Sequence, residues 1–310
     1  MTNQRNYDIF ILGKYFKIYS ERRRFFKLGK SIMITSFKGG VGKSTVAVNL
    51  AVGLAVDKHK VLIIDLDASS GSVDLFMGCE HDTLYNFCDV TEKKVKIQDA
   101  VYVKKVEKRG TQNDGAATEP YYSLDVLKAP PSYDMSVSLE EAVGEFIEET
   151  KEIYDFIIFD CPSGKFALFE VLVKKTDMVF AITLHAAASI RSAEKLALYL
   201  SENGRASENV RLVINCFNPR GVARGINLGI VDIIERSKIK LIGLIPLNSQ
   251  LRDFQEIGRT VYDIKNKRTR QYFDDIIGRI LENNIILSKK YDGLKTDRLY
   301  FKKETKNNPK

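Results

Sequence analysis

The sequence predicts an α/β fold, a mostly parallel, doubly wound sheet with helices on both faces. Short runs that are apolar throughout alternate along the chain with segments of helical periodicity, as in sheets that are buried on both sides. A glycine-rich turn, Lys38–Thr45, joins the first such run to the first helical segment, which is the position of a phosphate-binding loop. We expect about seven or eight strands in one compact domain.

The individual elements follow from two kinds of apolar spacing. Runs rich in β-branched residues predict strands at 31–36, 61–65, 155–160, 178–183, 210–216 and 240–245. Apolar residues at helical spacing predict helices at 44–56, 137–150, 189–203, 226–237 and 269–283. The segment 108–121 holds turn residues without a period, so we expect an exposed loop there.

The composition is that of an ordinary globular protein, with 44% hydrophobic and 28% charged residues. No stretch approaches the roughly 20 apolar residues of a membrane-spanning helix, and no secretory signal pattern is apparent. The four cysteines form no C-x-x-C pair, which argues against a zinc site or a disulfide framework. We therefore expect a cytoplasmic protein.

The net charge of +8 is concentrated at the two ends. Residues 1–30 carry eight Lys and Arg against two acidic side chains, a net +6, and residues 284–310 carry eight against three, a net +5. The segment 31–283 is left at −3. We expect a basic amphipathic N-terminal extension (1–30), an ATPase domain (31–283) and a basic C-terminal tail (284–310). An acidic surface would be met chiefly by the ends.

The glycine-rich turn has the residue types that phosphate binding requires. Its glycines allow successive backbone N–H groups to point at phosphate oxygens, and the helix that follows adds a favourable dipole. Lys43 is expected to reach the β- and γ-phosphates, and the Ser44 hydroxyl to bind Mg²⁺. The whole expected loop is Lys38, Gly39, Gly40, Val41, Gly42, Lys43, Ser44 and Thr45.

A lysine directly before the paired glycines is the deviant Walker A signature, and with it the chain resembles the MinD/ParA family of P-loop NTPases, of the SIMIBI type. In that family the first lysine is understood to cross a dimer interface and contact the partner's nucleotide. The resemblance gives Lys38 this role and implies that hydrolysis depends on dimerisation, as with an arginine finger. It covers roughly residues 31–283.

The resemblance also assigns three carboxylates. Asp65 and Asp67 match the D-x-D of the family after the second strand, where Asp65 would support the magnesium shell and Asp67 would position the attacking water. Asp160 ends an apolar run as in a Walker B strand and is expected to contact Mg²⁺. Gly164 would lie near the γ-phosphate in a switch loop. Taken alone, a strand-end aspartate is more often a loop cap, but the phosphate loop upstream favours the functional interpretation.

Asn215 follows a later strand, where many relatives place an asparagine against the adenine edge. An asparagine at a strand end also satisfies local backbone groups, so both interpretations are open.

The MinD branch is the part of the family to which the chain is most similar. The similar stretches are Val73–Glu80, Thr83–Val90, Asn218–Gly225 and Ile239–Pro246. The chain departs from this branch at Phe37, where a glycine is usual, and at Ser163, where the pattern D-x-P-A-G has alanine. The segment 67–74 is closer to pilus-associated relatives of the CpaE type.

The resemblance and the ends together imply a function. We expect a slow, switch-type ATPase that forms a homodimer with ATP, associates with the inner face of the cell membrane and positions a protein partner complex, such as the division machinery. Residues 11–26 combine an apolar, aromatic face with basic residues, the composition of an interfacial membrane anchor. The alternatives are a ParA-like, DNA-associated partition ATPase and a flagellar or pilus-placement ATPase. DNA would meet the basic cluster Lys265, Lys267, Arg268 and Arg270.

Overall fold

The computed structural model describes residues 28–79, 84–107, 121–133, 137–263, 267–283 and 285. Eight strands are found in this part of the chain: β1 (Lys30–Ser36), β2 (Val61–Asp65), β3 (Tyr102–Glu107), β4 (Tyr121–Leu127), β5 (Phe156–Ser163), β6 (Met178–Thr183), β7 (Val210–Phe217) and β8 (Lys240–Pro246). They form one sheet in the order β3-β4-β2-β5-β1-β6-β7-β8. Every neighbouring pair is parallel except β3 and β4, which are antiparallel. The expected mostly parallel sheet is confirmed.

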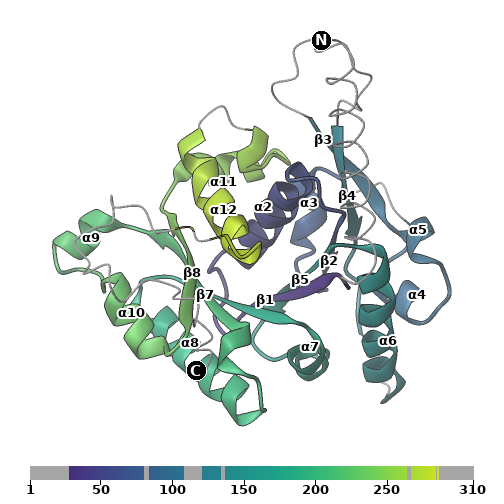
Figure 1. Ribbon diagram of the computed structural model, residues 1–310, viewed down its shortest axis with the longest axis horizontal. Helices are drawn as coiled ribbons and strands as arrows, with labels where there is room; N and C mark the ends of the chain where they lie inside the picture. The colour runs from purple at the N-terminus through teal and green to yellow at the C-terminus, as the bar shows by residue number, and fades with distance from the viewer. Residues whose placement is uncertain are drawn as a thin grey trace, which may run out of the picture.

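Helices cover both faces of this sheet (Figure 1). One face carries α2 (Lys43–Val56), α3 (Ser72–Met77), α11 (Ser249–Gln255) and α12 (Lys267–Ile280). The other carries α6 (Val137–Ile153), α7 (Phe169–Lys175), α8 (Ala187–Glu202) and α10 (Ile230–Ser237). Short helices are α4 (Phe87–Thr91), α5 (Ile97–Ala100) and α9 (Pro219–Ala223), with 3₁₀ turns at Ser207–Asn209 and Val261–Asp263.

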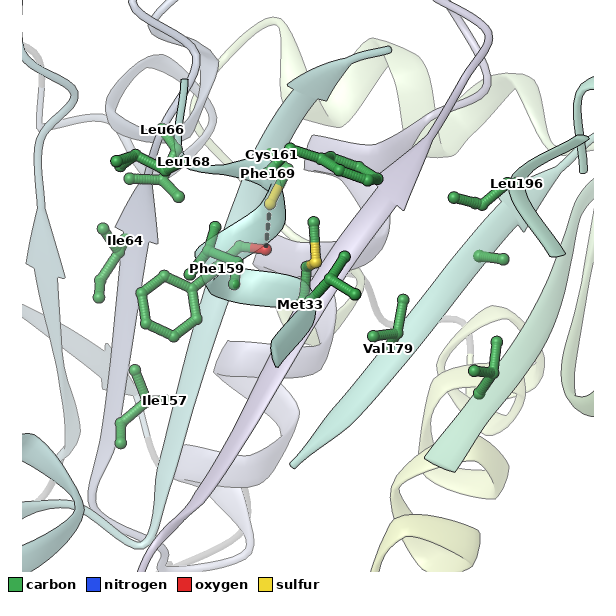
Figure 2. Close-up of a cluster of buried hydrophobic side chains, with 14 of the residues drawn as sticks. Met33, Ile64, Leu66, Ile157, Phe159, Cys161, Leu168, Phe169, Val179 and Leu196 are labelled. Atoms are coloured by element: carbon green, nitrogen blue, oxygen red, sulfur yellow. Dashed lines mark hydrogen bonds between the residues drawn. The ribbon is translucent and has the colours of Figure 1, made fainter. Parts of the chain in front are cut away.

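The core is divided by the sheet into two layers, because successive side chains of a strand point to opposite faces. In β1, Ile32 and Ile34 pack in the layer of α2 and α12, whereas Met33 packs in the layer of α6, α7 and α8. Figure 2 shows Met33 and Phe159 in this second layer, with Phe169 of α7 close by. All of these side chains are fully buried, and burying each contributes on the order of 2 kcal/mol.

The observed elements differ from the predicted ones in several places. The predicted helix 226–237 is confirmed over α10 (Ile230–Ser237), but it begins four residues later than expected, because the chain turns at Gly225 with a φ of 69° after the short helix α9 (Pro219–Ala223). Proline at the first helical position and a left-handed glycine after the last are the usual limits of a short helix, and they explain the bounds of α9. The helices α3, α7 and α11 were not predicted. The strands β3 and β4 were not predicted at all.

Both charged ends fall almost entirely outside the described residues, so the expected extension and tail are not part of this fold description. The expected loop 108–121 is also outside, except for Tyr121, which begins β4. Among the helices that are described, none has the length and apolar character needed to cross a bilayer.

Candidate active site

The glycine-rich loop lies between the end of β1 and the start of α2, at the carboxyl edge of the sheet (Figure 1). Gly40 has a φ of 70° and Gly42 a φ of 88°, left-handed values that favour glycine. Val41 between them is fully buried and anchors the loop to the core. Thus a short buried strand, two left-handed glycines and a helix start give the loop the shape of a phosphate cradle.

Asn215 lies directly beside this loop. Its Nδ2 donates to the Val41 carbonyl oxygen at 2.9 Å, and its Oδ1 accepts from the Cys216 N–H at 2.9 Å. A Cβ atom added to Gly42 would lie only 2.2 Å from Asn215 Nδ2. Asn215 therefore supports the loop from β7, a role that sequence reasoning did not identify, and its contact with adenine stays a prediction.

A second carboxamide holds the other end of the loop. The Thr45 hydroxyl donates to Gln255 Oε1 at 3.0 Å, and Gln255 is 5% exposed at the end of α11. One turn further along α2, Asn49 Oδ1 accepts from the Val261 N–H at 2.8 Å. Gln255 belongs to no recognisable sequence motif, so only the tertiary structure reveals its hydrogen bond with Thr45.

Asp65 ends β2 and is paired in register with Asp160 of the adjacent strand β5, three residues before the end of that strand. Asp65 accepts from the backbone N–H groups of Asp67 at 2.8 Å and Val73 at 3.0 Å. Burial raises the pKa of Asp65 to about 6, although these two N–H groups act against the increase. The two neighbouring carboxylates thus have different surroundings, since Asp65 accepts two backbone hydrogen bonds and Asp160 accepts none from the part of the chain that the structure describes.

Asp160 is 1% exposed, and neither of its carboxylate oxygens has a hydrogen-bond partner in the described part of the chain. Burial, and after it the charge of Asp65, raise the pKa of Asp160 well above its ordinary value, while the nearby Ser44 hydroxyl and Lys43 favour the ionised form. Burying an ionised carboxylate costs folding free energy unless a cation or a hydrogen-bond donor binds to it.

This arrangement fits the Mg²⁺ ion that the sequence implies. Among the described residues, no three His, Cys, Asp or Glu side chains are grouped so that they could hold a metal alone. Mg²⁺ at nucleotide sites is typically held by one or two carboxylates together with phosphates and water. The carboxylate of Asp160 and the nearby Ser44 hydroxyl provide oxygen ligands of this kind.

Asp67 lies in the loop after β2 and is half-buried. Its Oδ1 accepts from the N–H groups of Ser69 at 3.1 Å and Ser70 at 3.3 Å. These bonds shape the loop locally, as aspartate often does. Its expected action on the attacking water stays a prediction.

The two lysines of the loop differ in their surroundings. Lys43 is 8% exposed, and its Nζ donates to Ser163 Oγ at 2.7 Å. Lys38 is half-buried, and its backbone N–H donates to Ser36 Oγ at 3.2 Å. The Ser36 carbonyl in turn accepts from the Gly164 N–H at 2.9 Å, which joins the loop to the segment after β5. Gly164, expected in a switch loop, therefore lies beside the start of the phosphate loop.

The basic cluster considered for DNA is only partly visible. Lys265 lies outside the described residues, and the side chains of Lys267 and Arg268 are not described. The Arg270 Nε donates to Asp274 Oδ2 at 3.1 Å, and its guanidinium lies 4.9 Å from the centroid of the Tyr262 ring. Arg270 is thus engaged within the protein.

Comparisons with known proteins agree with this geometry. A family model described as an AAA domain matches residues 29–207. The septum site-determining protein MinD of Helicobacter pylori is 30% identical over 220 residues, which are 69% of this chain and 77% of that protein. The MinD cell division protein of Aquifex aeolicus has a solved structure that superposes with a TM-score of 0.70 at 30% identity, covering 84% of this chain and all of that one. A MinC:MinD cell division protein complex from the same organism gives a TM-score of 0.69 at 27% identity, covering 84% and 99%.

Proposed function

This chain belongs to the MinD/ParA family of P-loop ATPases, and on that premise we propose that it is a slow ATPase switch that dimerises on ATP binding, associates with the membrane and positions a partner complex. The observation that carries the proposal is the phosphate loop with its signature Lys38, placed beside the unpartnered carboxylate of Asp160. A cradle for anionic phosphates next to a buried carboxylate whose oxygens accept no hydrogen bond from the described residues supports Mg-ATP as the ligand.

In this proposal the residues of the site have separate tasks. The loop N–H groups and Lys43 bind the phosphates, and Asp67 orients the attacking water. Ser44 and Asp160 are the residues that would hold Mg²⁺, with Asp65 supporting them, and the ion when bound would neutralise phosphate charge. Asn215 and Gln255 keep the loop in shape from two sides, through bonds of 2.9 Å and 3.0 Å.

Dimerisation is proposed because Lys43 is already assigned to the phosphates bound by its own loop. Lys38 is then left to contact the nucleotide of a partner subunit. A lysine supplied by the partner subunit would complete the site only in the dimer, so that hydrolysis waits for assembly. The membrane step rests on the basic, aromatic composition of residues 11–26. Two weak anchors on one dimer bind together more tightly than one, since the second insertion is intramolecular.

The partner is proposed to be a protein complex of cell division, because the similar Aquifex aeolicus protein is known in a MinC:MinD complex. A partner of this kind would be recruited only by the dimer, which makes its position depend on the nucleotide.

Sedimentation velocity with Mg-ATP or Mg-ADP tests the dimer. We expect a dimer only with ATP, most clearly in an Asp67→Ala variant that hydrolyses slowly, and we expect Lys38→Ala to lose both the dimer and hydrolysis. Lys195→Ala, at an exposed position on α8, is the matched control. A Lys38→Ala protein that still dimerises and hydrolyses ATP at the normal rate would refute the role of Lys38.

Pelleting with anionic liposomes tests the membrane step. ATP-dependent pelleting that is lost when residues 1–27 are removed supports the proposed anchor. Equal pelleting with and without these residues would contradict it, and the same assay with duplex DNA would then examine the alternative surface.

A further inference from the structure

Ser163 is a residue of the site to which the proposed mechanism gives no task. It is the last residue of β5, three positions after Asp160, and it is exposed. Its Oγ lies 2.7 Å from Lys43 Nζ and 3.6 Å from the point where a Cβ atom of Gly39 would lie. The hydroxyl is therefore placed directly over the phosphate loop.

The backbone holds Ser163 in this position. The pairing of β1 with β5 shifts its register between Ile34 and Ser36, so that Ser163 comes opposite Ser36. The next residue, Gly164, has a φ of 82° and donates its N–H to the Ser36 carbonyl oxygen at 2.9 Å. An irregularity of this kind beside a functional site redirects a side chain, here toward the loop.

The hydroxyl has capacity left for a ligand. A serine oxygen can accept from a lysine and donate its own hydrogen at the same time. Ser163 Oγ accepts from Lys43, and no residue of the described chain accepts a hydrogen bond from it. A ligand oxygen bound by Lys43 would come within reach of this hydrogen.

We propose that Ser163 contacts the γ-phosphate and thereby helps the protein to distinguish ATP from ADP. The inference depends on the proposed function, since it assumes that Lys43 binds the β- and γ-phosphates. Ser163 adds a donor at the outer end of the loop, where only the triphosphate has an oxygen. A hydrogen bond to a charged phosphate is among the stronger kinds.

The same geometry allows a purely structural role, in which Ser163 only holds Lys43. Removal of the hydroxyl would then weaken ADP as well as the triphosphate, because Lys43 binds the β-phosphate of both. The dissociation constant for ADP therefore separates the two roles, since loss of a γ-phosphate contact alone leaves it unchanged.

The experiment is calorimetric titration of the full-length protein with Mg-ADP and with the Mg complex of the β,γ-imido analogue of ATP. The variants are Ser163→Ala, Ser163→Thr, and Ser201→Ala as a control at an exposed position of α8. We expect Ser163→Ala to lower the preference for the triphosphate about tenfold, or about 1.4 kcal/mol. Ser163→Thr keeps a hydroxyl and should retain most of the preference, and Ser201→Ala should match the wild type.

Two negative results have different meanings. If Ser163→Ala weakens ADP as much as the triphosphate, or weakens neither, the γ-phosphate contact is wrong. If the wild-type protein binds neither nucleotide, the proposed function itself is wrong.

Discussion

The ring of Phe37 packs against the ring of Phe169, with centroids 5.7 Å apart. Phe37 directly precedes the signature Lys38, and Phe169 begins α7, five residues after Gly164. Phe169 also contacts Phe166 at 5.8 Å and Tyr199 of α8 at 5.5 Å. One ring thus joins the start of the phosphate loop to the segment that follows Asp160.

Replacing Phe37 with glycine should weaken this connection. We expect Phe37→Gly to lower the free energy of unfolding by about 1–3 kcal/mol, because a half-buried aromatic side chain is lost and the backbone before Lys38 is freed. The affinity for ADP should change little, whereas ATP hydrolysis should fall severalfold. Urea unfolding and a phosphate-release assay measure the two effects. Phe37→Leu should lose less stability, and equal losses in both variants would argue against a specific ring contact.

Gly42 and Asn215 should show strong coupling in a double-mutant cycle. A side chain at Gly42 is strained by the φ of 88° and would collide with Asn215 Nδ2, whereas a side chain at Gly40 meets no atom within 4 Å. We therefore expect Gly42→Ala to lower ATP affinity by more than tenfold and Gly40→Ala to lower it less. Adding Asn215→Ala to Gly42→Ala should restore part of the affinity, because the collision is removed. Additive effects of the two changes, measured by nucleotide titration, would contradict this.

The sequence allowed prediction of elements whose surroundings are uniform. The strands 61–65 and 178–183 have the predicted bounds because both faces of each are covered, which leaves a continuous apolar run. By contrast, β3 lies at the edge of the sheet and carries Lys104 and Lys105 in its middle, with Lys105 exposed, so it lacked such a run. Edge strands commonly carry charged residues, which hide them from a search for apolar runs.

The candidate site divides in the same way. The position of the glycine-rich loop between a strand and a helix was predictable because its spacing along the chain requires that context, whereas the binding of phosphate and Mg²⁺ by the loop and the aspartates stays a prediction. The supporting contacts were not, since Asn215 and Gln255 reach loop residues that are 174 and 210 positions away in the chain. Ser163 and Phe37 were visible only as departures from a family pattern, and their contacts required the fold.

Asp177 should stabilise the fold in a pH-dependent way. Its Oδ2 accepts from the Ser31 N–H at 2.7 Å and the Ser31 hydroxyl at 2.8 Å, and its Oδ1 accepts from Lys151 Nζ at 3.1 Å. Burial would raise the pKa of Asp177, but these bonds outweigh it and lower the pKa below the ordinary 3.8. A lowered carboxyl pKa contributes stability above that value, and the contribution is lost as the pH falls through the folded-state pKa.

We expect Asp177→Asn to cost about 1 kcal/mol at pH 7, a value reduced for screening because the Asp177 side chain is 42% exposed. The difference from the wild type should shrink once the pH falls below the folded-state pKa of Asp177, which lies under 3.8. Urea unfolding at both pH values measures this, with Asp253→Asn at an exposed position of α11 as the control. A difference that does not depend on pH would rule out the linkage.

Replacing Asp160 with asparagine should stabilise the protein without nucleotide but weaken its stabilisation by Mg-ATP. The Asp160 carboxylate is buried without a partner in the described chain, so its ionised form is costly in the protein without nucleotide. We expect Asp160→Asn to raise the free energy of unfolding by about 1–2 kcal/mol at pH 8 in the presence of a chelator, since asparagine cannot ionise. The same variant should lose the stabilisation that Mg²⁺ with ATP gives the wild type, because a carboxylate expected to hold the ion is gone. Thermal unfolding with and without Mg-ATP measures both effects. A variant that is less stable than the wild type in the chelator would mean that the carboxylate is compensated within the fold, and the argument for a cation at this position would lose its support.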